Sequence, residues 1–289
     1  MFKNKFHAGI IKTFTVLVAM SLMVTITHAA DVKSATATLT AEQVADKNAA
    51  ARGGLNAWLA VQSMTMMGKM DAGKIKPPPK QGMEMSRQGM EKGHRPKPVK
   101  QEEGKVVELP FVLEMQRPHK SRLEIEFAGQ TAVQVFDGTK GWKLRPFLGR
   151  REVESYSPDE MKTAIQQQDM EGVLIGYAAK STKLALDKME QVEGKDAYKL
   201  ILTMKDGQVR HVWVDAKTFL DVKMDGTRTL NGKPRTVETY FRNYKAVDGL
   251  QMPYLIETSV EGIRGSEKIN VEKIVVNAKL DDTRFTKPE

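Results

Sequence analysis

Apolar and polar positions alternate along most of the stretch from Asp196 to Gly262. Val, Ile, Thr, Tyr, Phe and Trp recur there with period two, which is typical of half-buried strands. Two-residue turn signals separate the runs, and each suits a hairpin turn with positive φ at both central residues: Asp206-Gly207, Asn231-Gly232 and Asp248-Gly249. No helix of ordinary length fits between these turns, so the stretch is predicted to be an antiparallel β-meander.

The same alternation predicts strands on both sides of the meander. They are expected at 63–70, 108–116, 122–127, 131–136 and 142–147, and again at 182–192 and 267–276. Within a strand the apolar residues share one face, as Met64, Met66 and Met70 do in the first. We expect about eleven strands in total, and antiparallel sheets of that size curl or close.

Two amphipathic helices have clear start signals. Thr40 caps the first, which is expected to run to about Arg52, pause at Gly53-Gly54 and continue through Leu59. The second starts with the sequence Ser-Pro-Asp-Glu at 157–160 and is expected to reach about Asp169. A further short helix is expected at 173–179. This order predicts a mainly β (α+β) fold: a strongly curved, unclosed antiparallel β-barrel with two or three helices forming a lid on its concave side.

The first 30 residues form a predicted secretory signal peptide. Lys3, Lys5 and Lys12 precede a largely apolar run, and small residues allow cleavage near Ala29 or Ala30. The chain has no cysteine, so its fold depends on a core and not on disulfides, and a lipid anchor at the cleavage site is excluded. Residues 31–289 are expected to form a single exported, periplasmic domain.

The positive charge of the chain is concentrated in one segment. The formal net charge is +9, but residues 74–105 alone carry nine Lys or Arg against four Glu. This Pro- and Gly-rich stretch is predicted to be a disordered basic insertion. Met83, Met85, Met90 and His94 could form a soft copper site there, although a solvated loop, or one that touches anionic lipid or an acidic partner, explains them too. No nucleic-acid-binding body is expected.

Residue constellations typical of catalysis are absent from the sequence. Only His94, His119 and His211 remain after the signal peptide, and they match no zinc pattern. There is no Gly-x-Ser-x-Gly elbow, no phosphate-binding glycine loop and no cysteine. We therefore expect a protein that is not an enzyme and uses no cofactor and no metal, and its exported β fold favours binding or carriage.

Four stretches of the mature chain have distinctive wording: ARGGLNAW, FDGTKGWKLRPF, VWVDAKTFL and the Tyr-x-x-Val-Asp-Gly-Leu-x-x-Pro sequence at Tyr244–Pro253. Together they resemble the LolA-like family of outer-membrane lipoprotein-sorting proteins. The resemblance extends from about Ala41 to Leu280. It implies an unclosed barrel whose helices cover an apolar cavity for acyl chains of lipids or lipoproteins. It also implies an arginine on an early strand that latches the lid, which no motif places here.

The cavity implied by this resemblance would be lined by large apolar residues of the predicted strands. The candidate ligand-binding residues are Met64, Met66, Met70, Phe111, Leu113, Met115, Leu123, Ile125, Phe127, Trp142, Trp213 and Phe241. A filled structural core would use the same residue types. Besides acyl chains, envelope proteins of the inner or outer membrane are possible partners, and membrane contact would be transient. The alternatives are an envelope sensor or protein-binding module that uses the same sheet and, ranked last, an esterase.

Overall fold

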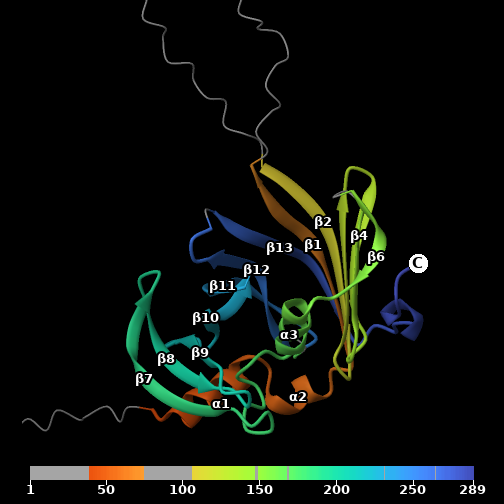
Figure 1. Ribbon diagram of the computed structural model, residues 1–289. Coiled ribbons are helices and arrows are strands. Elements are labelled where there is room, and N and C mark those ends of the chain that lie inside the picture. Colours follow the sequence, from red (N-terminus) through yellow and green to blue (C-terminus); the bar gives the residue numbers. More distant parts are fainter. Residues whose placement is uncertain (1–38, 75–105, 147–148, 168, 231, 264) are drawn as a thin grey trace, which may run out of the picture. The chain divides into compact units, whose positions relative to one another are not determined.

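The computed structural model describes residues 39–74, 106–146, 149–167, 169–230, 232–263 and 265–289 (Figure 1). The predicted signal peptide lies outside the described residues, as does the basic insertion from residue 75 on. The helices are α1 (Ala41–Ala51), α2 (Leu55–Leu59), α3 (Pro158–Gln166) and the 3-10 helix η2 (Asp282–Phe285). The first six strands are β1 (Ser63–Lys74), β2 (Val106–Gln116), β3 (Lys120–Phe127), β4 (Gln130–Phe136), β5 (Gly141–Arg145) and β6 (Arg150–Ser155). The others are β7 (Lys183–Val192), β8 (Lys195–Thr203), β9 (Val209–Asp215), β10 (Asp221–Leu230), β11 (Lys233–Val247), β12 (Leu250–Val260) and β13 (Ser266–Val276).

All thirteen strands form one curved, unclosed antiparallel sheet. Its order is β6-β5-β4-β3-β2-β1-β13-β12-β11-β10-β9-β8-β7, so β1 and β13 are the only hydrogen-bonded neighbours in this part of the chain that are not sequential strands. That pairing sets Met64 opposite Val276 and Met70 opposite Ile269. The predicted fold class is confirmed, but thirteen strands replace the expected eleven or so. One that was not expected is β6, whose sequence Arg-Arg-Glu-Val-Glu-Ser lacks apolar alternation.

Of the three turns predicted in the meander, one has the expected conformation, one is longer, and Asn231 of the third lies outside the described residues. Asp248 and Gly249 have φ values of 48° and 82°, as a tight hairpin with two positive φ values requires. At Asp206-Gly207 only the glycine has positive φ, and the amide of Met204 donates to the carbonyl of Gln208. The loop is thus one residue longer than expected, because a turn followed by a left-handed glycine connects these strands.

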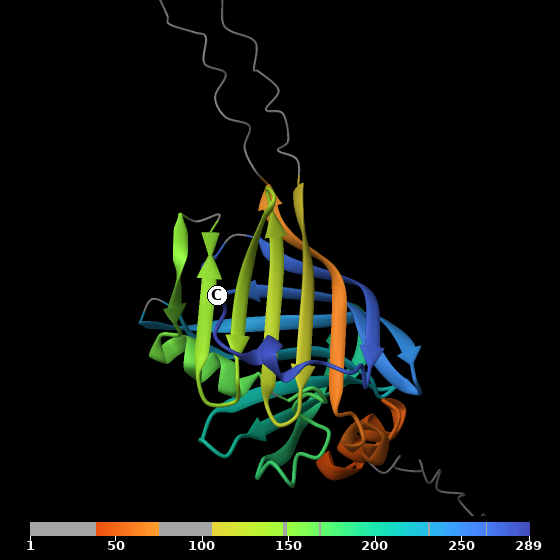
Figure 2. The ribbon, with the colours of Figure 1, turned by 90° about the vertical axis from the view of Figure 1, so that its right-hand side faces the viewer.

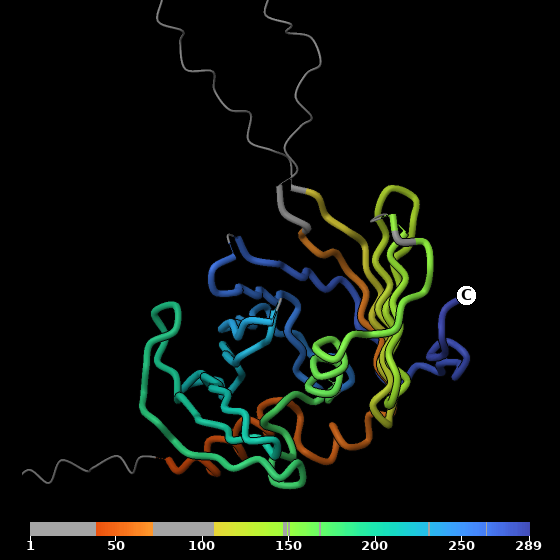
Figure 3. The backbone as a smooth tube through the Cα atoms, in the orientation of Figure 1, coloured from red at the N-terminus to blue at the C-terminus, as the bar shows by residue number. Residues whose placement is uncertain are grey.

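The three α-helices lie on one face of the sheet, which we call the inner face (Figures 1 and 3). The predicted caps are confirmed at Thr40 for α1 and at Ser157 for α3, and both form capping boxes. The prediction of a further short helix at 173–179 is wrong, because these residues form turns and bends. Helix α3 ends at Gln166 rather than near Asp169. On the opposite, outer face the C-terminal segment with η2 crosses β2, β3 and β4 (Figure 2).

Two apolar clusters join the helices to the inner face. In the first, Trp58 of α2 and Ile175 of the turn segment pack on β1, β2, β12 and β13. In the second, Ala41 and Val44 of α1, together with Leu174, pack on β8 and β9. Both clusters use residues 169–182, which follow α3, so this segment and the two N-terminal helices form one cover, which we call the lid.

Candidate functional site

The inner face of the central strands is apolar in consecutive rows. Cross-strand register places Met66 opposite Leu113 and Leu113 opposite Leu123. A second row runs across the β1–β13 junction: Met70 opposite Ile269, then Ile256, then Phe241. Because residues directly opposite in a sheet point to the same face, these rows form one continuous apolar surface. We call it the apolar inner face: Met66, Met70, Leu113, Leu123, Ile125, Phe241, Ile256 and Ile269.

Burial is uneven on this side of the sheet, where Phe111, Val271 and Ile274 are buried among the half-buried residues. Trp58, Met64 and Ile175 are fully buried where the lid covers the sheet. The members of the apolar inner face are all only half-buried. Neighbouring large apolar side chains that each keep part of their surface in contact with water form an apolar patch, and such patches are candidate contact surfaces for a ligand. The part of the inner face beyond the lid therefore has the character of a binding surface.

Buried ion pairs fix the lid to the sheet. Arg52, which follows α1, lies 3.2 Å from a carboxylate oxygen of Asp221 on β10 and donates to the backbone carbonyl of Glu171. The Glu171 carboxylate in turn pairs with Arg117 at 2.8 Å and with Lys180 at 3.0 Å. Arg117 stands at the end of β2 and also donates to the carbonyl of Val61. These contacts link both helices and the turn segment to the strands beneath them.

The two carboxylates of this network have opposite pKa shifts. Burial raises the pKa of Asp221, and Arg52 and Asn48 offset that effect only in part. Burial also acts to raise the pKa of Glu171, but Lys180 and Arg117 outweigh it and hold the pKa below its usual range. Glu171 is therefore the carboxylate whose charge stabilises the closed lid.

Replacing Glu171 with glutamine should reduce stability in a pH-dependent way. At pH 7 we expect a loss of about 1.5–3 kcal/mol, since charge-assisted hydrogen bonds from Arg117 and Lys180 disappear. A lowered folded-state pKa gives stability that is present above the ordinary value of 4.5 and is lost as pH falls through the folded value. The difference between wild type and Glu171→Gln, measured by urea unfolding, should thus shrink below about pH 4.5.

An exposed glutamate on β6 provides the control for this experiment. Glu152→Gln should leave the free energy of unfolding within about 0.5 kcal/mol of wild type. Asp221 is present in wild type and in both variants. Its raised pKa affects the pH dependence of stability with the opposite sign, and this effect cancels when the variants are compared with wild type. A Glu171→Gln deficit that stays constant between pH 7 and pH 3 would show that the carboxylate charge does not stabilise the lid.

Most of the sequence-predicted ligand residues lie together. Seven pack in the cluster under and beside the lid: Met64, Met66, Met70, Phe111, Leu113, Leu123 and Ile125. Met115 is opposite Met64, and Phe241 joins the row of Ile256. Phe127 lies at the end of β3, where a cavity of about 380 Å³ is also lined by the carboxylate residues Glu108 and Glu126. That cavity is mixed in character and belongs to the rim of the sheet.

The two predicted tryptophans lie apart from this group. Trp142 packs with Val133, Val135 and Phe285 beneath the C-terminal segment. Trp213 lies in a small separate cluster, donates to Glu190 at 2.8 Å, and has Lys199 and Lys223 over its ring. Its strand neighbours Val212 and Val214 pack against α1 on the inner face, so Trp213 faces outward.

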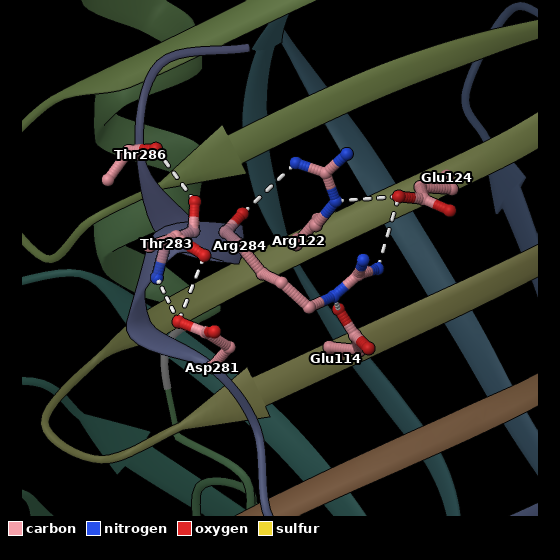
Figure 4. Close-up of polar contacts among 7 residues, drawn as sticks. All are labelled: Glu114, Arg122, Glu124, Asp281, Thr283, Arg284 and Thr286. Carbon is pink, nitrogen blue, oxygen red and sulfur yellow. Dashed lines mark hydrogen bonds and ion pairs between the residues drawn. The ribbon is translucent and has the colours of Figure 1, made fainter.

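Polar contacts on the outer face hold the C-terminal segment in place (Figure 4). Arg284 lies between Glu114 and Glu124, and Arg122 donates to the backbone carbonyl of Arg284 at 3.0 Å. Arg122, although it is on an early strand, therefore contacts the C-terminal segment and not the lid. The arginine that contacts the lid from the early strands is Arg117.

Sequence reasoning missed several residues that complete the site. Ile256 and Ile269 belong to rows formed only by the long-range pairing of β1 with β13. Glu171 and Lys180 lie in a turn segment with no periodic pattern. Arg117 did carry a signal, because it directly precedes a proline at the end of a strand, but that position alone does not reveal its partner.

Helix α3 bridges the two halves of the inner face. Lys143 on β5 lies 2.5–2.6 Å from the carboxylate of Glu160 on α3. The other side of α3 borders a cleft of about 220 Å³ that includes Gln208 and Arg228 of the opposite half of the sheet. Because α3 contacts β5 on one half of the sheet and β10 on the other, it spans the inner side between the two halves (Figure 3).

Metal and membrane features are not found in the described residues. No three His, Asp or Glu side chains in this part of the chain come together as a metal site. His211 instead pairs with Asp225 through its Nδ1 atom at 2.7 Å. No helix in the same part is long and apolar enough to span a membrane. The suggested copper ligands Met83, Met85, Met90 and His94 lie outside the described residues.

Solved structures share this architecture. A LolA superfamily protein of Nitrosomonas europaea matches with a TM-score of 0.52 at 15% identity, covering 86% of this chain and 99% of that chain. The fold is LolA-like. A DUF1329 family protein of Desulfovibrio piger matches with a TM-score of 0.53 at 15% identity, covering 86% and 98% of the two chains. The sequence matches no family model and no curated protein.

These structural similarities establish a LolA-like fold but no function, because the sequence identity is only 15%. The predicted resemblance is therefore confirmed at the level of fold. The geometry peculiar to this chain has to supply the rest: a half-buried apolar inner face, a lid held by buried ion pairs, and α3 between the two halves of the sheet.

Proposed function

We propose that the protein is a periplasmic carrier that binds acyl chains of lipids or lipoproteins on its apolar inner face. The observation that carries this proposal is the burial of that face. Its eight large apolar side chains point toward the helices yet remain half-buried. Each CH₂ group moved from water onto such a surface contributes about 0.8 kcal/mol, so one acyl chain supplies ample binding energy.

Several further features support a carrier. The LolA-like fold and the predicted signal peptide both fit a protein that works in the bacterial envelope. Residues Met64, Met66, Met70, Phe111, Leu113, Met115, Leu123, Ile125, Phe127 and Phe241 supply the inner wall, with Met side chains adapting to different chains. Trp142 and Trp213 have structural roles on the outer face in this proposal. Binding and release need no covalent chemistry.

Native mass spectrometry of the protein purified from a bacterial envelope tests this proposal. We expect bound species whose masses correspond to acyl-containing molecules and which dissociate on mild activation. An exported β protein without this surface serves as the purification control. Protein that arrives without any acyl species and also fails to bind an added fluorescent fatty acid would refute the carrier function.

A further inference from the structure

The inner face changes character next to the apolar rows. Thr239 and Thr258 lie opposite each other with their hydroxyl oxygens 3.3 Å apart, and Thr258 is opposite Glu267. This polar row is two residues along the strands from the row of Phe241, Ile256 and Ile269, a distance of about 7 Å. The inner face as a whole is therefore amphipathic, with polar groups immediately beside the apolar surface.

Arginines stand beyond the polar row on neighbouring strands. Arg210 on β9 shares its face with Val212, and Arg228 on β10 shares its face with Met224, both of which pack in the inner cluster under α1. Gly226, two residues before Arg228 on β10, leaves room for the Arg210 side chain, whose Cγ would lie 3.4 Å from an added Cβ. Both guanidinium side chains are half-buried and directed to the inner side of the sheet.

These two arginines are not neutralised by close carboxylates. Among the described residues, no ion pair or hydrogen bond is formed by the guanidinium group of either Arg210 or Arg228. Burial lowers the pKa of Arg210, and Arg228 lowers it further, while Asp206 and Asp169 act in the opposite direction from farther away. The two positive charges thus lie near each other without a bound counter-ion in the protein.

The cleft beside α3 adds a donor that also lacks a partner. Arg228 lines this cleft of about 220 Å³ together with Lys162, Gln166, Gln208, Thr227 and Thr229, and with Thr163 and Asp159 of α3. The Nε2 atom of Gln166 is buried and has no hydrogen-bond partner. A buried amide without a partner costs free energy, which a ligand that accepts its hydrogen bond would recover.

Two carboxylates near this region, those of Asp159 and Glu267, oppose its positive charge. Asp159 lines the cleft itself. Glu267 lies across the inner face, and burial raises the pKa of its carboxyl group while the positive charge of Arg228 partly offsets that rise. Neither lies within ion-pair distance of Arg228 in the part of the chain that the structure describes. With Arg210, Arg228 and Lys162 opposing them, the donors and positive charges predominate.

We propose that Arg228 and Arg210, with Gln166 of α3, bind the oxyanion head group of an amphiphile whose chain lies on the apolar inner face. The inference rests on the proposed carrier function and names its ligand class. A guanidinium group matches the geometry of a phosphate or carboxylate with two parallel hydrogen bonds. In register Arg228 is opposite Arg235, six residues along β11 from Phe241, and Thr239 and Val237 lie between them on the same face. The head-group site therefore lies toward one end of the inner face and the apolar rows lie farther along it.

Matched probes with one chain and different head groups test this inference. Hexadecyl phosphate and palmitate carry an oxyanion, hexadecanol carries none, and inorganic phosphate has no chain. We expect the wild-type protein to bind hexadecyl phosphate about tenfold more tightly than hexadecanol, since charge-assisted hydrogen bonds form only with the former. Arg228→Gln should remove that preference and leave hexadecanol binding unchanged, whereas Arg151→Gln on the exposed face of β6 should retain it.

A second variant distinguishes loss of the head-group site from loss of folding. Glu267→Gln removes the carboxylate that opposes the arginines, so it should tighten binding of hexadecyl phosphate several-fold, a gain that a misfolded protein cannot give. Equal affinity of wild type for hexadecyl phosphate and hexadecanol, or a preference that survives Arg228→Gln, would overturn the head-group site. Binding of inorganic phosphate as tightly as hexadecyl phosphate would show a site for free anions. If no chain-bearing probe bound at all, the carrier function itself would fail.

Discussion

Replacing Trp58 with alanine is expected to lower the free energy of unfolding by about 3–5 kcal/mol. Trp58 has no exposed surface and packs between Val61, Met64 and Ile175 at the centre of the first apolar cluster. Its indole also donates to the carbonyl of Arg52 and lies under that guanidinium group. The substitution therefore opens a cavity where the lid meets the sheet and removes one of the two hydrogen bonds that the Arg52 carbonyl accepts, the other coming from the amide of Gln251.

The adjacent residue supplies a matched control in the same short helix. Leu59 is 52% exposed, so Leu59→Ala should cost no more than about 0.5–1 kcal/mol. Urea unfolding followed by circular dichroism measures both variants without relying on tryptophan fluorescence. Equal destabilisation by the two substitutions would mean that α2 is not anchored through Trp58.

Much of the fold could be predicted from local pattern. The period-two alternation of β8 to β12 and the Asp248-Gly249 turn determined antiparallel hairpins, because each hairpin depends only on neighbouring residues. The capping boxes at Thr40 and Ser157 likewise located the starts of α1 and α3. The strand β6 was missed since its charged sequence lies at a sheet edge, where pairing requires no apolar face.

Features that depend on distant parts of the chain could not be predicted in this way. The β1–β13 pairing joins strands about two hundred residues apart, and nothing in either strand identifies the other. The segment 169–182 owes its conformation to Arg52, Arg117 and Lys180 and not to a periodic pattern. Local propensity contributes little where tertiary contacts determine the backbone.

The candidate site shows the same division. Alternation predicted that Met64, Met66 and Met70 share a face, and they do. Alternation cannot state which face of a strand is the inner one, and so Trp142 and Trp213 entered the same group although both lie on the outer side. The arginines of the proposed head-group site gave no signal, because a single Arg in a strand resembles any solvent-exposed residue.

Substituting Met66 with glutamine should weaken acyl binding by about tenfold, because a polar amide replaces a thioether on the surface that the chain covers. Met67, the next residue of β1, is equally half-buried but points to the outer face. Met67→Gln makes the same chemical change and should alter affinity by no more than about twofold. Both substitutions conserve size and charge, so the difference between them reports only the face of the sheet.

Titration of a fluorescent fatty acid into wild type, Met66→Gln and Met67→Gln compares these faces in one experiment. Circular dichroism melting of each protein establishes that all three are folded. Saturable binding to wild type and Met67→Gln, with affinity about tenfold lower for Met66→Gln, is the result that the carrier account predicts. Equal affinity for the two variants, or a larger loss in Met67→Gln, would place the acyl chain elsewhere and contradict the account.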